Sequence, residues 1–189
     1  MTDHRHVLQL DLQGTPQAWI SLEQAAVCVA MDAVAWVDGD GPLAVLRGGF
    51  NVTSGRPSRI EVHPIMALRS ASRVNLFERV SAPTRHRLVR RDRFTCAYCG
   101  GQFAERALQC EHIVPASRGG PWSWMNLVAA CGACNGRKAA RTPEEARMPL
   151  LFTPYVPSRF ETFLLEGRNI RADVHEWLAA RLPKGSRLN

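Results

Sequence analysis

The alternation of apolar and polar residues predicts a small mixed α/β module in the first 80 residues. It follows the pattern of a half-buried strand over 7–12. Ser21 and Gln24 have the spacing of a capping box, so we expect a helix over 22–30. Short apolar runs between turn-forming residues indicate further strands over 33–37, 43–47, 60–65 and 67–74. Nothing in this module resembles a catalytic cluster, so its role stays unassigned, with a scaffold as the simplest interpretation.

Several helix signals follow in the second half of the chain. A short helix is expected to end at Arg91, shortly before Cys96. Thr142 begins a second capping box with Pro143 at the first helical position, and Ser158 begins a third. A last amphipathic helix is predicted over 172–182, where proline and glycine stop it.

Composition places the chain among ordinary globular proteins. Its 189 residues are 46% hydrophobic and 22% charged, which excludes general disorder, a collagen-like repeat and a coiled coil. No apolar run reaches the roughly 18 residues of a membrane span. The first residues also lack a secretory signal pattern. We therefore expect no membrane partner and a cytoplasmic location, in a bacterium or from a phage.

The net charge of +7 points to a polyanionic partner. All but two of the 24 basic residues are arginine, which binds phosphate through a bidentate fork, although a GC-rich genome explains the same bias equally well. Residues 66–95 hold eight arginines against two acidic residues. We expect this basic stretch to contact nucleic acid.

Four of the six cysteines form two C-x-x-C pairs, Cys96 with Cys99 and Cys131 with Cys134. Without an export signal, a disulfide framework is a poor interpretation. Two such pairs predict one tetrahedral structural zinc site, whereas a redox dithiol would need only one pair. Cys28 and Cys110 are expected to face the core, with metal contact as the lesser alternative for Cys110.

The order of polar residues around the second pair is more specific than any one of them. A Glu-His pair at 111–112 is followed by Pro115, Gly119, Gly120, Asn126 and Asn135. In this order, residues 88–149 resemble the HNH endonuclease family of the His-Me finger, or ββα-metal, superfamily. The first half of the chain is similar to the module that precedes this motif in a zinc-knuckle-containing bacterial HNH subfamily.

The resemblance implies an α+β fold and a role for each matching residue. The fold is a ββα-metal nuclease core stapled by a four-cysteine zinc site, preceded by a small mixed α/β module and followed by a helical C-terminal arm. His112 falls on the catalytic general base and Asn126 on the residue that holds its loop. Glu111 and Asn135 fall on the ligands of a divalent cation, although Glu111 departs from the commoner Asp or His.

General chemistry agrees with these roles. Histidine titrates near neutral pH, so neutral His112 can take a proton from water, a step typically worth about 10²–10⁴-fold. Glu111 and Asn135 offer oxygen ligands, which favour Mg²⁺ or Mn²⁺ as the catalytic ion. The candidate phosphate contacts are Arg90, Arg91, Arg118, Arg137, Lys138 and Arg141.

The same family pattern places strands over 110–113 and 127–129 and a helix after the second cysteine pair. Asn135, in the first turn of that helix, is then expected to face His112 across the hairpin. Trp122 and Trp124 have two interpretations, stacking on a base or sugar and packing beneath the loop, of which packing is favoured.

We therefore predict three parts: 1–80, a mixed α/β module of unassigned role; 81–149, the HNH domain; and 150–189, the helical arm. The predicted function is metal-dependent hydrolysis of DNA, expected to be double-stranded. Two alternatives stay open, a zinc-stabilised nucleic-acid-binding module that does not cleave and an RNase. The source of specificity is also open: the N-terminal module, DNA shape, or a partner, which would be a second copy of the chain or another protein.

Overall fold

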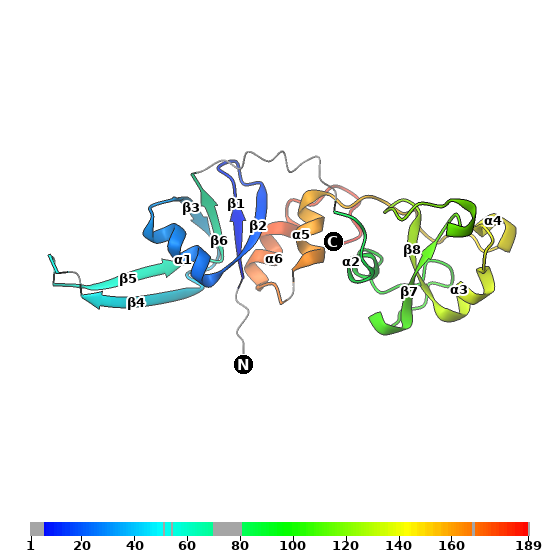
Figure 1. Cartoon of the computed structure of the whole chain (residues 1–189), viewed down its shortest axis with the longest axis horizontal. Helices are drawn as coiled ribbons and strands as arrows, with labels where there is room; N and C mark the ends of the chain where they lie inside the picture. The colour runs from blue at the N-terminus through cyan, green and yellow to red at the C-terminus, as the bar shows by residue number, and fades with distance from the viewer. Residues whose placement is uncertain (1–5, 51, 54, 70–80, 168, 189) are drawn as a thin grey trace. The chain divides into compact units, whose positions relative to one another are not determined.

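The computed structural model describes residues 6–50, 52, 53, 55–69, 81–167 and 169–188. The chain divides into two compact units, one formed by 1–79 with 167–181 and the other by 80–166 with 182–189 (Figure 1). The predicted arm over 150–189 is thus shared between the two units. Part of the predicted strand 67–74, and Arg73 and Arg79 of the basic stretch, lie outside the described residues. None of the described helices has the length and apolar character to cross a membrane.

A four-stranded sheet organises the first unit, in the order β2-β1-β6-β3. Its strands are β1 (His6–Leu10), β2 (Pro16–Ser21), β3 (Val34–Asp38) and β6 (Ile65–Leu68). β1 pairs antiparallel with β2 and parallel with β6, and β6 pairs antiparallel with β3. The sheet is therefore mixed, as the sequence pattern predicts for this module.

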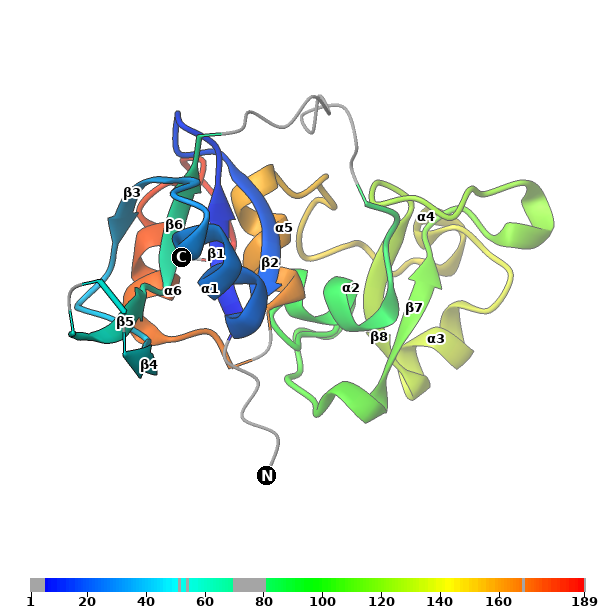
Figure 2. The ribbon, with the colours of Figure 1, turned by 60° about the vertical axis from the view of Figure 1, so that its left-hand side comes forward.

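Helix α1 (Leu22–Ala30) covers one face of this sheet, where Ala25 packs against Val7, Ile20 and Met66. Helix α6 (Ala172–Ala179) lies on the opposite side (Figure 2). Because side chains alternate along a strand, the two faces of β1 each bury their own apolar residues. Helix α6 ends three residues earlier than the predicted range 172–182.

The strands β4 (Ala44–Phe50) and β5 (Pro57–Val62) form a separate antiparallel pair in the first unit. The sequence pattern predicts strands on both sides of the turn that follows β3, and both strands exist. The two strands that flank this turn, β3 and β4, do not pair with each other. β3 pairs with β6 at the edge of the sheet, and β4 pairs with β5.

A ββα arrangement is the centre of the second unit, and it confirms the predicted nuclease-type core. β7 (Leu108–His112) pairs antiparallel with β8 (Leu127–Cys131), and α3 (Gly132–Lys138) follows β8 without a break. The pairing places His112 opposite Leu127. The remaining elements are α2 (Arg85–Arg91), α4 (Pro143–Ala146), α5 (Arg159–Glu166) and two short 3₁₀ turns, η1 (Glu105–Ala107) and η2 (Ala116–Arg118).

Polar caps fix where the predicted helices begin. Ser21 and Gln24 exchange side-chain and backbone hydrogen bonds at the start of α1, and Thr142 and Glu145 do so at α4. Ser158 and Glu161 form the same reciprocal pair at α5, with distances of 3.3 and 2.7 Å. These three helix starts lie where the sequence predicts them, because a capping box is a local signal.

A buried ion pair ties α2 to the hairpin. Arg91 and Asp92 are both buried, and the Asp92 carboxylate accepts two hydrogen bonds from Arg91 and one from the backbone N–H of Ala129, at 2.7 Å. The guanidinium also donates to the carbonyl oxygens of Trp124 and Leu127 at 2.7 and 2.8 Å. The expectation that Arg91 contacts phosphate is therefore wrong, because its N–H groups are inside the fold and already used.

Candidate active site and metal centre

The four cysteines of the two C-x-x-C pairs converge in the second unit. Cys96 and Cys99 follow α2, and Cys131 and Cys134 lie at the junction of β8 and α3. All four Sγ atoms lie within 4.8 Å of one another. Zinc–sulfur bonds of about 2.3 Å in a tetrahedron require sulfur atoms roughly 3.8 Å apart, so the cluster fits one zinc ion.

The turn after Cys99 has the geometry of a metal knuckle. Gly100 has a φ of +73° and donates its backbone N–H to the Cys96 carbonyl at 3.0 Å. A left-handed conformation there favours glycine, which explains the glycine in the predicted knuckle.

Without a metal, the thiols of Cys96 and Cys134 differ widely in pKa. Burial by itself raises the pKa of Cys96, but backbone N–H groups of Cys131, Cys99 and Tyr98 donate to its sulfur and lower the pKa to about 7. Burial and the neighbouring sulfur atoms raise the pKa of Cys134 to about 12. Four thiolates cannot share this space without a positive ion, and a coordinated metal deprotonates its thiol ligands.

The other two cysteines belong to hydrophobic packing. Cys110 packs against the cluster of Leu88, Trp124, Leu127 and Leu165, and Cys28, a residue of α1, packs against the core of the first unit. Within the described part of the chain, the two C-x-x-C pairs make up the one group of three or more His, Cys, Asp or Glu side chains suited to a metal ion. Cys110 is not a member of it.

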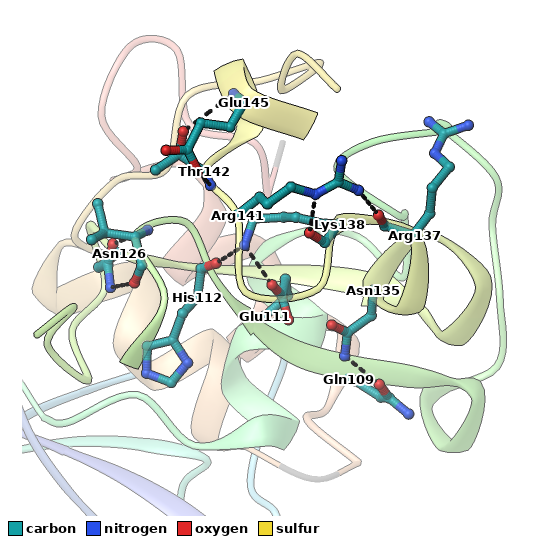
Figure 3. Close-up of polar contacts among 11 residues, drawn as sticks. Gln109, Glu111, His112, Asn126, Asn135, Arg137, Lys138, Arg141, Thr142 and Glu145 are labelled. Carbon is teal, nitrogen blue, oxygen red and sulfur yellow. Dashed lines mark hydrogen bonds and ion pairs between the residues drawn. The ribbon is translucent and has the colours of Figure 1, made fainter. Parts of the chain in front are cut away.

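His112 ends β7 and presents its ring away from the polar cluster that its neighbours form (Figure 3). The imidazole meets the indole of Trp122 edge-on, with ring centroids 5.5 Å apart and an interplanar angle of 64°. Trp122 is 53% exposed and donates its indole N–H to the Pro83 carbonyl at 2.8 Å. The half-buried imidazole therefore has a fixed aromatic neighbour and remains open to water.

Asn126 closes the loop between the two strands. Its side-chain oxygen accepts from the Val114 N–H at 2.9 Å, and its side-chain nitrogen donates to the carbonyls of Val114 and Pro121 at 3.1 and 3.0 Å. Gly120 is required beside it, because a Cβ at that position would lie 1.8 Å from the Val114 carbonyl oxygen. The amide thus fixes the chain directly after His112.

Glu111 is paired with a lysine. The Lys138 ammonium lies 2.7 Å from Glu111 Oε1 and 2.6 Å from the His112 carbonyl oxygen (Figure 3). The Lys138 side chain is fully buried, and the Glu111 side chain is 11% exposed. The expected phosphate contact at Lys138 is therefore wrong. The lysine compensates the Glu111 charge and holds the end of β7.

Asn135 turns toward the strand residue Gln109, whose side-chain oxygen accepts a hydrogen bond from the Asn135 amide (Figure 3). Gln109 and Glu111 alternate with His112 along β7, so they share the opposite face of the strand. The expectation that Asn135 faces His112 is therefore wrong, because the Asn135 side chain lies on the other face of the strand, beside Gln109. The two oxygens that could still hold a cation are Glu111 Oε2 and Asn135 Oδ1, a weak set with one carboxylate that Lys138 already compensates.

Four predicted phosphate contacts remain available to different degrees. Arg118 pairs with both carboxylate oxygens of Glu145, at 2.7 and 2.8 Å, on the surface. Arg137 and Arg141 are exposed on and after α3, and Arg141 also donates to the Arg137 and Lys138 carbonyls. Arg90 is half-buried and donates to the Leu165 carbonyl at 3.1 Å.

Helix periodicity could have identified the two buried cations. Arg91 follows the buried Leu88 by three residues, and Lys138 follows the buried Cys134 of the cysteine cluster by four. Residues three or four apart share one face of a helix. Trp124 is buried as favoured, with its indole N–H bonded to the Ser81 carbonyl at 2.7 Å, whereas Trp122 is exposed and the favoured burial is wrong for it. The edge contact of Trp122 with His112 has no signal in the sequence.

Residues 96–151 match the family model for HNH endonucleases. The match includes all four cysteines of the metal cluster and every residue of the proposed catalytic set, and it covers less than a third of the chain. The second unit of this chain therefore carries an HNH endonuclease domain, and the family implies metal-dependent nuclease activity. A comparison with curated proteins gives no significant match for the chain.

Proposed function

We propose that this protein is an endonuclease that hydrolyses phosphodiester bonds of double-stranded DNA, with His112 as the general base. The observation that carries the proposal is the placement of the imidazole at the end of β7. Lys138 donates a hydrogen bond to the backbone carbonyl of His112, and Trp122 contacts the His112 ring. Asn126 holds the loop that follows. A base held in this way loses little freedom when substrate binds.

His112 acts by taking a proton from the water that attacks phosphorus. The neighbouring indole of Trp122 limits the directions that the imidazole can take, and solvent reaches the imidazole on its open side. General-base catalysis of this type typically supplies about 10²–10⁴-fold. The leaving 3′ oxygen then requires positive charge or a proton donor nearby.

A divalent cation, Mg²⁺ or Mn²⁺, would be held by the oxygens of Glu111 and Asn135 and would supply charge neutralisation at the phosphate and the leaving oxygen. Lys138 keeps Glu111 in place on its strand, because the ammonium engages Oε1. The proposed zinc has no part in this chemistry, because all four of its ligands are cysteine thiolates. No position is left open for a water, as is typical of structural zinc.

Exposed arginines supply the phosphate contacts in this proposal. Arg118, Arg137 and Arg141 lie on the loop after β7 and at the end of α3, within the unit that contains His112. The Arg118 pair with Glu145 is on the surface, where an ion pair is worth little, so a phosphate can replace the carboxylate. These contacts position a backbone without reading its sequence.

The Lys138–Glu111 pair favours a second function, a zinc-stabilised module that binds nucleic acid without cleaving it. A carboxylate that is already compensated by an ammonium attracts a divalent cation less strongly than a free one. In this alternative the lysine substitutes for the catalytic ion, and binding persists without metal-dependent turnover.

Incubation with supercoiled plasmid and, separately, with a structured RNA decides between these functions. Zinc-loaded protein is assayed with Mg²⁺, with Mn²⁺ and without an added divalent cation. We expect metal-dependent conversion of plasmid to open circles before linear DNA, because one site on each chain cuts one strand at a time. Binding without nicking would support the non-cleaving module, and cleavage of RNA alone would replace DNA as the substrate.

A further inference from the structure

The β4–β5 ribbon of the first unit extends away from its own sheet (Figure 1). Six of the seven residues of β4 are exposed, as are the first three of β5. The ribbon is anchored at the end where Leu43, Ile60 and Val62 pack in the core beneath α1. An isolated two-stranded hairpin is marginally stable in water, so an arm of this kind is expected to serve a surface outside its own unit.

Arginines occupy the exposed length of the ribbon. The register places Arg47 directly opposite Arg59 on the same face, and Arg56 precedes β5. Like charges at directly opposed positions destabilise a strand pair. Arg59 is paired with Glu61 at 2.5 Å, while no ion pair within the described residues joins Arg47 or Arg56 to an acidic group. The unbalanced positive charge fits a polyanion.

The far end of the ribbon adds an exposed aromatic ring. Phe50, the last residue of β4, is 75% exposed and lies opposite Pro57. The register shifts between Arg47 and Phe50, where Gly48 and Gly49 leave two successive positions of the strand without side chains. An exposed phenylalanine beside arginines supplies the apolar contact that major-groove proteins make with thymine methyl groups.

We infer that the β4–β5 ribbon is a second nucleic-acid contact, which lies in a groove of double-stranded DNA with Arg47, Arg56 and Arg59 on the phosphates and Phe50 in the groove. A major groove about 12 Å wide admits a two-stranded ribbon, whose strands lie about 5 Å apart. This inference rests on the proposed function for its choice of DNA over other polyanions. It gives the first unit a role in substrate binding.

Anisotropy of a labelled DNA duplex tests the inference without relying on cleavage. The full chain with His112→Ala is titrated at several salt concentrations without an added divalent cation, alone and with Arg47→Gln plus Arg59→Gln. We expect binding to weaken at least several-fold and the slope of log affinity against log salt to fall by about one for each arginine that is lost. Arg181→Gln, an exposed arginine of the same unit outside both the ribbon and the basic stretch, is the charge control and should change little.

Phe50→Ala tests the apolar part of the contact, and Met31→Ala is its control because Met31 is 74% exposed at the end of α1. The phenylalanine variant is expected to weaken binding with an unchanged salt slope, and the methionine variant to bind like its parent. Thermal melts that match the parent show that each variant is folded.

Unchanged duplex binding by the ribbon variants, in a protein that binds and nicks DNA, would overturn this inference and leave the proposed function intact. Failure of the parent protein to bind or nick any DNA would instead overturn the proposed function. A concentration-dependent dimer that Phe50→Ala abolishes, with DNA binding unaffected, would show that the ribbon pairs with a second copy of the chain and would also overturn the inference.

Discussion

The ammonium of Lys138 lies between the carboxylate of Glu111 and the carbonyl of His112, at 2.7 and 2.6 Å. It therefore connects the last turn of α3 to the end of β7, where the proposed base is located. The pair is buried, so its attraction is offset by the free energy of removing both charges from water. Its main effect is on position, because it fixes the backbone on which the imidazole is carried.

Substitution of Lys138 tests that positioning role. Lys138→Met leaves Glu111 buried without a counter-charge, and we expect a loss of about 3–5 kcal/mol in the free energy of unfolding, measured by urea denaturation. The double variant Lys138→Met with Glu111→Leu should recover most of this stability but not nicking activity. Recovery of activity by the double variant would show that neither residue positions the base.

At the scale of single residues, the sequence predicts some members of the site and not others. The four cysteines, His112 and Asn126 follow from an ordered motif, and the structure places the cysteines together and Asn126 on the loop after His112. The predicted roles of Arg91 and Lys138 are wrong because charge alone does not establish exposure. Their burial depends on the face of each helix, and their partners come from distant segments that a motif does not specify.

At the scale of elements, local signals and long-range pairings differ in what they reveal. Helix α1 has the predicted bounds because a reciprocal cap fixes its first turn. Strand existence also follows from apolar runs, but partners do not. β3 pairs with β6, although both strands of the β4–β5 ribbon lie between them in the sequence. It does not pair with β4, the next strand along the chain. Such pairings depend on which edges remain free once the sheet forms, and the local pattern does not contain that information.

The two C-x-x-C pairs are the elements on which we expect the second unit to depend. They join the segment after α2 to the start of α3, and apparent zinc binding energies in small modules are roughly 10–16 kcal/mol. Cys131→Ser should therefore lose the bound zinc and unfold the ββα core, measured by metal analysis and by circular dichroism. Cys28→Ser is the matched control outside the cluster. A Cys131→Ser protein that is folded and free of zinc would contradict the predicted metal centre.

At the scale of the whole molecule, the chain separates its proposed chemistry from its ribbon. The second unit carries the metal cluster, His112 and the exposed arginines of the loop and α3, while the first carries the β4–β5 ribbon. The HNH match lies within the second unit. Motif placement alone predicts where the HNH domain lies. The division of residues 150–189 between both units does not follow from any motif, because the packing of a chain end depends on tertiary contacts.

The most direct test of the central claim is the rate of plasmid nicking by His112→Ala in the presence of Mg²⁺ or Mn²⁺, with duplex binding measured on the same samples. His175→Ala, an exposed histidine of the other unit, is the control and should nick like the unmodified protein. We predict a loss of about 10²–10⁴-fold in nicking by His112→Ala with DNA affinity nearly unchanged. Nicking by His112→Ala at the unmodified rate would contradict the assignment of His112 as the general base.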